Sequence, residues 1–339
     1  MKKQKNVNEA FNVLSMKEEA KLSDPEKQVY YEKLREFLLN RKLQMTTKGA
    51  LIVAPKLKKM TEKIVKPVTK ILAGGKVSKI VGGVENVPDG PVIFAANHQG
   101  IMDGFVWIEG CPKHAVIVHS AETNKLLLTA QLNTGLVLVT KDKMRANDRL
   151  QAKLDMMSIL LKGHSIFICP ENAWNLSPNK LHLPLYWGIV ELAKKTGKPI
   201  VPLVINYVYD TSEPKERITR IEIRYGRPIY VGIEDEIDTK LNEYSDAIST
   251  IRWEFIEQQG IYKRSDVSDF EYINFLKGNL ANLNLGKIDI KRERDSIYGS
   301  KDDFYVFHHL NDVPFDEKGN LLETEEWKRL KMINAIHGI

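Results

Sequence analysis

The sequence predicts an α/β fold in which a mixed, mostly parallel sheet is flanked by helices and follows an N-terminal helical, membrane-associating region. From about residue 83, short runs rich in β-branched and aromatic residues alternate with helical segments, as in strands joined by crossover helices. Before that point, a lysine-rich segment carries apolar residues at helical spacing. Of the 339 residues, 43% are hydrophobic, so a sizeable core can form.

These patterns divide the chain into four expected regions. The first is polar and forms a weakly ordered terminus or a short helix, the second is helical and basic, the third is the α/β domain, and the fourth is a helix with an extension. Their ranges are 1–24, 25–80, 81–235 and 236–339. No apolar run approaches the ~18 residues of a transmembrane helix. The charged start has no apolar core, so no secretory signal is expected.

A helix is expected over 23–43, because Ser23 or Asp24 can cap it and Pro25 suits its first turn. Strands are expected at 91–96, 114–121, 135–140, 165–169, 199–209, 220–226 and 228–232. Further helices are expected at 121–133, 145–163, 184–197 and 235–260.

The basic segment from Met45 to Ile80 holds nine lysines and one acid, within a chain of net charge +6. Its apolar residues recur at spacings of three and four, so the lysines fall largely on the other side of a helix. Such a segment can lie on an anionic membrane surface, or it can be a surface helix with a solvated lysine face. Pro55 and Pro67 argue against one straight helix.

His98 and Asp103 are the first candidates for chemistry, because they directly follow the apolar run at 91–96. Open α/β sheets bind ligands at the carboxyl ends of their strands. There a neutral imidazole can remove a proton, and a carboxylate one helical turn into the next helix can fix its tautomer. The alternative is a loop with an incidental histidine.

Two more stretches follow predicted strands. Glu171, after Cys169 and Pro170, either hydrogen-bonds an acceptor hydroxyl or is a solvated turn residue. Cys169 lies in an apolar strand and is interpreted as a small buried residue rather than a nucleophile. Lys141 and Arg145 belong to a basic cluster that either binds a phosphate or is a solvated helix start.

Several classes are not supported. Two cysteines, Cys111 and Cys169, give neither a zinc spacing nor a disulfide framework, and a cytoplasmic setting is expected. The His308-His309 pair has no partners at metal spacing. The glycine-rich stretches lack a nucleotide-loop context, and no motif supports nucleic-acid binding.

The order of four blocks is more specific than any one of them. They read NHQGIMD at 97–103, GLVLVTK at 135–141, CPENAWN at 169–175 and GKPIVPLVI at 197–205. In this order they resemble the glycerolipid acyltransferase family, which includes the lysophosphatidate and glycerol-3-phosphate acyltransferases. The resemblance covers roughly residues 80–235.

The resemblance implies that His98 is the general base for an acceptor hydroxyl and that Asp103 orients it. The residues expected to contact the substrates are Asn97, Lys141, Arg145, Glu171, Asn172 and Pro202. The donor would be an acyl thioester of CoA or acyl carrier protein, or an acyl phosphate, with no metal and no cofactor. The acceptor would be a lyso-phospholipid, and the protein would sit peripherally on the inner face of the cell membrane.

The chain departs from the family at Asn172 and Ala173, where the family has glycine and threonine. Asparagine tolerates a left-handed backbone but adds a polar side chain. A different acceptor, such as a glycolipid or an amine, therefore stays open. A lipid-binding or scaffold protein on a degenerate acyltransferase fold is the other alternative.

Overall fold

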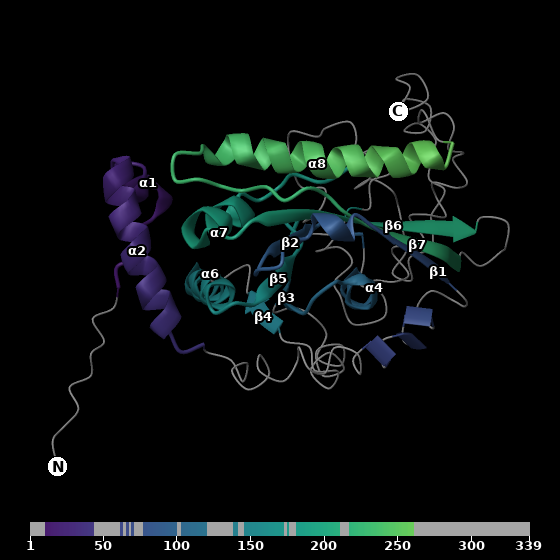
Figure 1. Ribbon diagram of the computed structural model, residues 1–339, viewed down its shortest axis with the longest axis horizontal. Helices are drawn as coiled ribbons and strands as arrows, with labels where there is room; N and C mark the ends of the chain where they lie inside the picture. The colour runs from purple at the N-terminus through teal and green to yellow at the C-terminus, as the bar shows by residue number, and fades with distance from the viewer. Residues whose placement is uncertain are drawn as a thin grey trace, which may run out of the picture.

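The structure, a computed structural model, describes most of the chain between residues 11 and 260 (Figure 1). The described ranges are 11–43, 62–63, 66–67, 69–70, 77–99, 103–120, 138–141, 146–172, 175, 181–210 and 217–260. The expected helix at 121–133 and the extension at 261–339 lie outside them.

A seven-stranded sheet forms the centre of the molecule, in the order β1-β7-β6-β2-β5-β3-β4. Its strands are β1 Ser78–Gly82, β2 Ile93–Ala96, β3 Ala115–Ser120, β4 Leu138–Lys141, β5 Ser165–Ile168, β6 Ile200–Asp210 and β7 Arg217–Tyr225. All neighbouring strands pair in parallel except β6 and β7, which form an antiparallel pair. The predicted mixed, mostly parallel sheet is confirmed.

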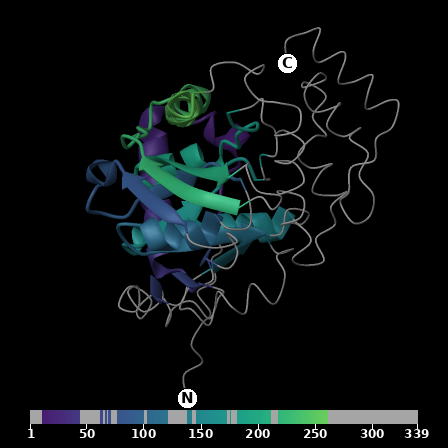
Figure 2. The same cartoon turned by 90° about the vertical axis from the view of Figure 1, so that its right-hand side faces the viewer.

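Helices cover both faces of the sheet (Figure 1). They are α1 Met16–Glu19, α2 Asp24–Asn40, α4 Asp103–Gly110, α6 Ala146–Leu161, α7 Gly188–Thr196 and α8 Ile237–Gln258, and a short 3-10 turn spans Val84–Asn86. Residues of α2, α6, α7 and α8 join one core cluster, whereas α4 joins the other. In the turned view α8 is seen nearly end-on, above the strands (Figure 2).

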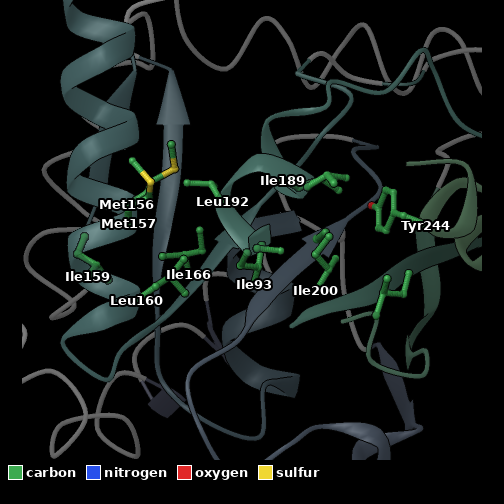
Figure 3. Packing of buried hydrophobic residues seen from close by; sticks show 14 of the residues in the cluster. Ile93, Met156, Met157, Ile159, Leu160, Ile166, Ile189, Leu192, Ile200 and Tyr244 are labelled. Carbon is green, nitrogen blue, oxygen red and sulfur yellow. The ribbon is translucent and has the colours of Figure 1, made fainter. Parts of the chain in front are cut away.

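The two core clusters follow from the period-two alternation of strand side chains. On β2, Ile93 and Ala95 belong to the cluster under α6, α7 and α8, while Phe94 and Ala96 belong to the cluster with α4. Figure 3 shows the first cluster, where Ile93 lies among side chains of neighbouring strands and helices. Because β2 is buried on both faces, its sequence is a continuous apolar run rather than an alternating one.

The N-terminal helices are docked on the α/β domain through buried charges. Lys195 of α7 is 1% exposed and contacts both Glu19 of α1 and Glu191 of its own helix at 2.8 Å. The Tyr31 hydroxyl of α2 also donates to Glu19. A buried ion pair is stable only when its charges are fully matched, so these contacts fix where α1 and α2 lie.

Two expectations about single elements were wrong. Residues 78–80 were expected within a helical region, but they belong to strand β1, which pairs in parallel with β7. Residues 228–232 were expected as a strand, but they form a single bridge between Ile229 and Ile200. None of the helices within the described ranges is long and apolar enough to cross a membrane.

Candidate active site

The candidate site lies where β2 and β5 end and β6 continues. β2 pairs in parallel with β6 up to Ala96 and Leu203, but β6 runs on to Asp210. The chain after β2 therefore passes along an open backbone edge of β6. His98 lies at this point, and α4 begins at Asp103.

His98 and Asp103 are in direct contact. Nδ1 of His98 lies 2.8 Å from Oδ2 of Asp103, and the imidazole is 25% exposed while the carboxylate side chain is 1% exposed. Asp103 was expected about one turn into a helix, and it is the first described residue of α4. The sheltered carboxylate holds one ring nitrogen and thereby sets the orientation of the ring.

Two further donors hold the Asp103 carboxylate. The backbone N–H of Gln99 donates to Oδ2 at 2.7 Å, and the hydroxyl of Tyr207 on β6 donates to Oδ1. Because Asp103 contacts His98 and Gln99 of the loop and Tyr207 of β6, its position is determined by two separate parts of the chain. Such multiple support is what a preorganised catalytic group requires.

Glu171 is 3% exposed and accepts hydrogen bonds from two backbone N–H groups. Its Oε1 accepts the backbone N–H of His98 at 2.8 Å, and its Oε2 accepts the N–H of Leu183 at 2.7 Å. Burial raises the pKa of Glu171 to about 8, although both N–H groups and the nearby Arg252 act in the opposite direction. The structure thus assigns Glu171 a part in holding the His98 loop, and a direct contact with the acceptor stays a prediction.

Asn97 and Pro202 are built into the sheet. The Asn97 amide, 2% exposed, donates to the Ile205 carbonyl at 3.0 Å and accepts the Ile205 N–H at 2.8 Å. It therefore completes the β6 ladder beyond the end of β2, and a contact with substrate stays a prediction. Pro202 is buried and pairs with Ala95 of β2. Its side chain packs so closely on Gly226 that a Cβ added at Gly226 would lie 3.1 Å from it.

The other expected contact residues are placed less fully. Asn172 follows Glu171 with φ 58°, and its N–H donates to the Cys169 carbonyl at 3.1 Å. This is the left-handed conformation that favours glycine and that asparagine tolerates. Lys141 ends β4, pairing with Ser120, and Arg145 lies outside the described residues.

Comparison with known proteins finds a family match for the part of the chain that holds His98, Asp103 and Glu171. Residues 79–206 match the family model described as Acyltransferase. This part of the chain is similar to the acyltransferase family. The match confirms the resemblance inferred from the order of the four blocks.

Among solved structures, a crystal structure of the 1-acyl-sn-glycerophosphate (LPA) acyltransferase PlsC from Thermotoga maritima is similar to the chain. The two share 18% identity with a TM-score of 0.46, over 67% of this chain and 88% of that one. No curated protein matches the chain.

The candidate site also includes residues that the sequence patterns did not indicate. Gln99 and Tyr207 support Asp103, and Arg252 of α8 lies in the same network. Alternation in the strand at 199–209 places Tyr207 on the same face as Ile205, and this is the one sequence pattern that bears on its position. No local pattern connects either residue with Asp103.

The thiol of Cys169 is a poor nucleophile at this site. Burial raises the pKa of the Cys169 thiol well above its usual range, and the carboxylates of Asp103 and Glu171 add to that effect. Within the described ranges, no group of three or more histidine, cysteine, aspartate or glutamate side chains could hold a metal ion.

Tyr207→Phe should lower kcat for acyl transfer about 10-fold, since a hydrogen bond to a charged group contributes about 1.5–3 kcal/mol. The substitution removes one donor from Asp103 and keeps the ring that packs in the core. Steady-state kinetics of the variant would test this. Tyr230→Phe, at a residue that is 61% exposed, is the matched control. Equal kcat in the two variants would show that the hydroxyl does not support the pair.

Proposed function

We propose that the protein transfers a fatty acyl group from an acyl thioester to a hydroxyl of a lyso-phospholipid or related glycerolipid. The observation that carries the proposal is the 2.8 Å contact between His98 Nδ1 and the buried Asp103 carboxylate, within a domain of the acyltransferase family. A histidine held in this way is suited to act as a general base.

The proposed reaction proceeds by direct attack of the acceptor. With its proton on Nδ1, next to Asp103, the imidazole of His98 takes the hydroxyl proton at Nε2 as the acceptor oxygen attacks the thioester carbonyl. A C–O bond forms and the C–S bond breaks. The departing thiolate recovers the proton from His98, and Asp103 stabilises the imidazolium while it exists. No metal or cofactor takes part in this scheme.

The donor is an acyl thioester of CoA or acyl carrier protein, and the acceptor class depends on Asn172. Its left-handed backbone, with φ 58°, is a conformation that glycine adopts readily. The added amide side chain gives the turn a hydrogen-bonding group that glycine lacks. An acceptor with a different polar group beside its hydroxyl, such as a glycolipid, is therefore the second candidate substrate.

An acceptor panel tests the proposal. The purified chain is incubated with palmitoyl-CoA or palmitoyl-acyl carrier protein and, in turn, lysophosphatidate, glycerol 3-phosphate, lyso-glycolipids and long-chain amines. Release of the free thiol that requires a hydroxyl acceptor supports the proposal. Binding of the lipids without turnover across the panel would favour a scaffold protein on an acyltransferase fold.

An anionic membrane surface is the proposed partner for the basic segment. In the described part of that segment, the helical residues Lys63, Lys66 and Lys70 are exposed, and Thr69 is buried. In a continuous helix, spacings of three and four would place the three lysines on one face. A lysine face of this kind attracts anionic lipids, with about 1 kcal/mol for each lysine near the surface.

Replacing Lys63, Lys66 and Lys70 with glutamine should weaken binding to vesicles containing phosphatidylglycerol by roughly 10- to 100-fold at low salt. Wild-type binding should fall as salt rises, because exposed charges are screened within about 10 Å at 0.1 M. Vesicle sedimentation measures both effects. The matched control replaces three exposed lysines on or beside α1 and α2: Lys17, Lys21 and Lys33. Equal loss in both triple variants would contradict a specific lysine face.

A further inference from the structure

Arg252 connects α8 with the loop that carries His98. It lies six residues before the end of α8, beyond the matched range 79–206. Spacings of three and four place it in line with Ser245 and Ile248 on the helix. Ile248 is buried in the core, so Arg252 lies at the sheet-facing side of α8.

The guanidinium of Arg252 binds the side chain of Gln99, the residue after His98. With its amide oriented to satisfy its neighbours, Gln99 accepts from Nη1 at 2.6 Å and from Nη2 at 2.9 Å. The same amide donates to the Ile205 carbonyl at 3.1 Å. A planar guanidinium that donates twice to one oxygen fixes the direction as well as the distance of its partner.

Arg252 is itself held by a chain of polar contacts across β6 and β7. Its Nη1 donates to Asn206 Oδ1 at 3.2 Å, and the Asn206 amide donates to Glu222 at 2.9 Å. Glu222 in turn accepts from Arg220 Nε at 2.9 Å. The guanidinium therefore has a defined position, set by the sheet, from which it holds Gln99.

Gln99 links Arg252 to the His98–Asp103 pair. Its side chain is held by Arg252, and its backbone N–H donates to the Asp103 oxygen that also contacts His98. Loss of the side-chain contact would let the loop move. The Gln99 N–H, which donates to Asp103, would move with it. The charge of Arg252 also acts on the site, because it lowers the pKa of Glu171 against the effect of burial.

We propose that Arg252 is a positioning residue, which holds the His98–Asp103 pair in its productive geometry through Gln99. The inference deepens the proposed acyl transfer and rests on it for its kinetic consequences. The geometric part, that Arg252 restrains the loop at 97–99, stands independently of the reaction.

A purely architectural arginine of the same helix interface provides the control. Arg224 of β7 contacts Glu254 of α8, and its guanidinium lies 4.6 Å from the ring centre of Phe255. Arg224→Met thus loses a contact between the sheet and α8 without touching Gln99. Arg252→Met loses a contact of similar kind together with the restraint on the loop.

The kinetic test compares Arg252→Met, Arg252→Lys and Arg224→Met in the full chain. Arg252→Met should lower kcat about 10- to 100-fold and leave KM within about 3-fold of the wild-type value. Loss of a hydrogen bond to a charged group changes a rate by a factor of about this size. Arg252→Lys should recover part of kcat, because it keeps the charge but not the fork. In a Gln99→Ala background, Arg252→Met should have little further effect. Losses that multiply there, or kcat equal to that of Arg224→Met, would overturn the proposal.

Amide exchange gives a readout that does not depend on turnover. The Gln99 N–H should exchange about 10-fold or more faster in Arg252→Met than in wild type, while Arg224→Met leaves it protected. If no variant transfers acyl groups but this difference is present, the proposed function fails and the positioning inference stands. If wild type is active and exchange at Gln99 is equal in both arginine variants, the inference fails alone.

Discussion

His98→Ala is expected to lower kcat for acyl transfer by about 10²- to 10⁴-fold, the usual contribution of a positioned general base. Asp103→Asn should cost less, about 10- to 100-fold, which corresponds to the loss of a charge-assisted hydrogen bond. The difference arises because the Gln99 N–H and His98 Nδ1 contact the same Asp103 oxygen. An asparagine can turn its amide oxygen toward these two groups and keep the proton on Nδ1, so that the loss is limited to the negative charge and to the acceptor of the Tyr207 hydroxyl.

The double variant distinguishes a cooperating pair from two independent groups. Because Asp103 acts through His98, the double variant should be no slower than His98→Ala alone. Steady-state kinetics of the three variants measure this, with His164→Ala as a control at a half-buried histidine after α6. A double variant whose loss is the product of the two single losses would show that Asp103 acts by another route.

Glu171→Gln is expected to change how stability depends on pH. The pKa of Glu171 is raised from 4.5 to about 8 by burial, so between these values the folded chain keeps a proton that the unfolded chain has released. The free energy of unfolding therefore falls as pH rises through this window, by up to about 1.4 kcal/mol per pH unit from this group. Glutamine does not titrate, so the variant should lack this contribution.

Denaturant unfolding of both proteins at pH 5, 6, 7 and 8 measures the effect. The variant loses one good acceptor for the N–H groups of His98 and Leu183, which lowers its stability at every pH by a constant amount. Only the difference in slope tests the prediction. Glu243→Gln, at an exposed residue of α8, should have the same slope of unfolding free energy against pH as the wild type. Parallel curves for wild type and Glu171→Gln would contradict a buried, proton-retaining Glu171.

Features that depend on local patterns could be predicted from the sequence. Buried strands such as β2 and β5 are short apolar runs between turn residues, and helix α2 begins with a capping box at Ser23 and Glu26. The contact between His98 and Asp103 spans five residues at a strand end, where ligands bind in this class of sheet. The order of the motif blocks then supported the family.

Features that depend on distant partners could not be predicted. β1 is an edge strand with a mixed pattern of exposure, so its alternation is weak. Asn97 meets Ile205 across 108 residues, and Tyr207 meets Asp103 across 104. Such contacts depend on which strands are neighbours and on the register in which β6 pairs with β2, and neither residue type nor spacing encodes that pairing.

The most direct test of the account is the product of a single reaction. Wild type and His98→Ala are each mixed with a heavy-isotope acyl thioester and the best acceptor of the panel, and the lipids are analysed by mass spectrometry. Wild type should add one labelled acyl group to the acceptor hydroxyl for each thiol released, and His98→Ala should form at most about 1% of that product. Equal amounts of acylated lipid from both proteins would contradict base catalysis by His98. Thiol release without acylated lipid would contradict acyl transfer itself.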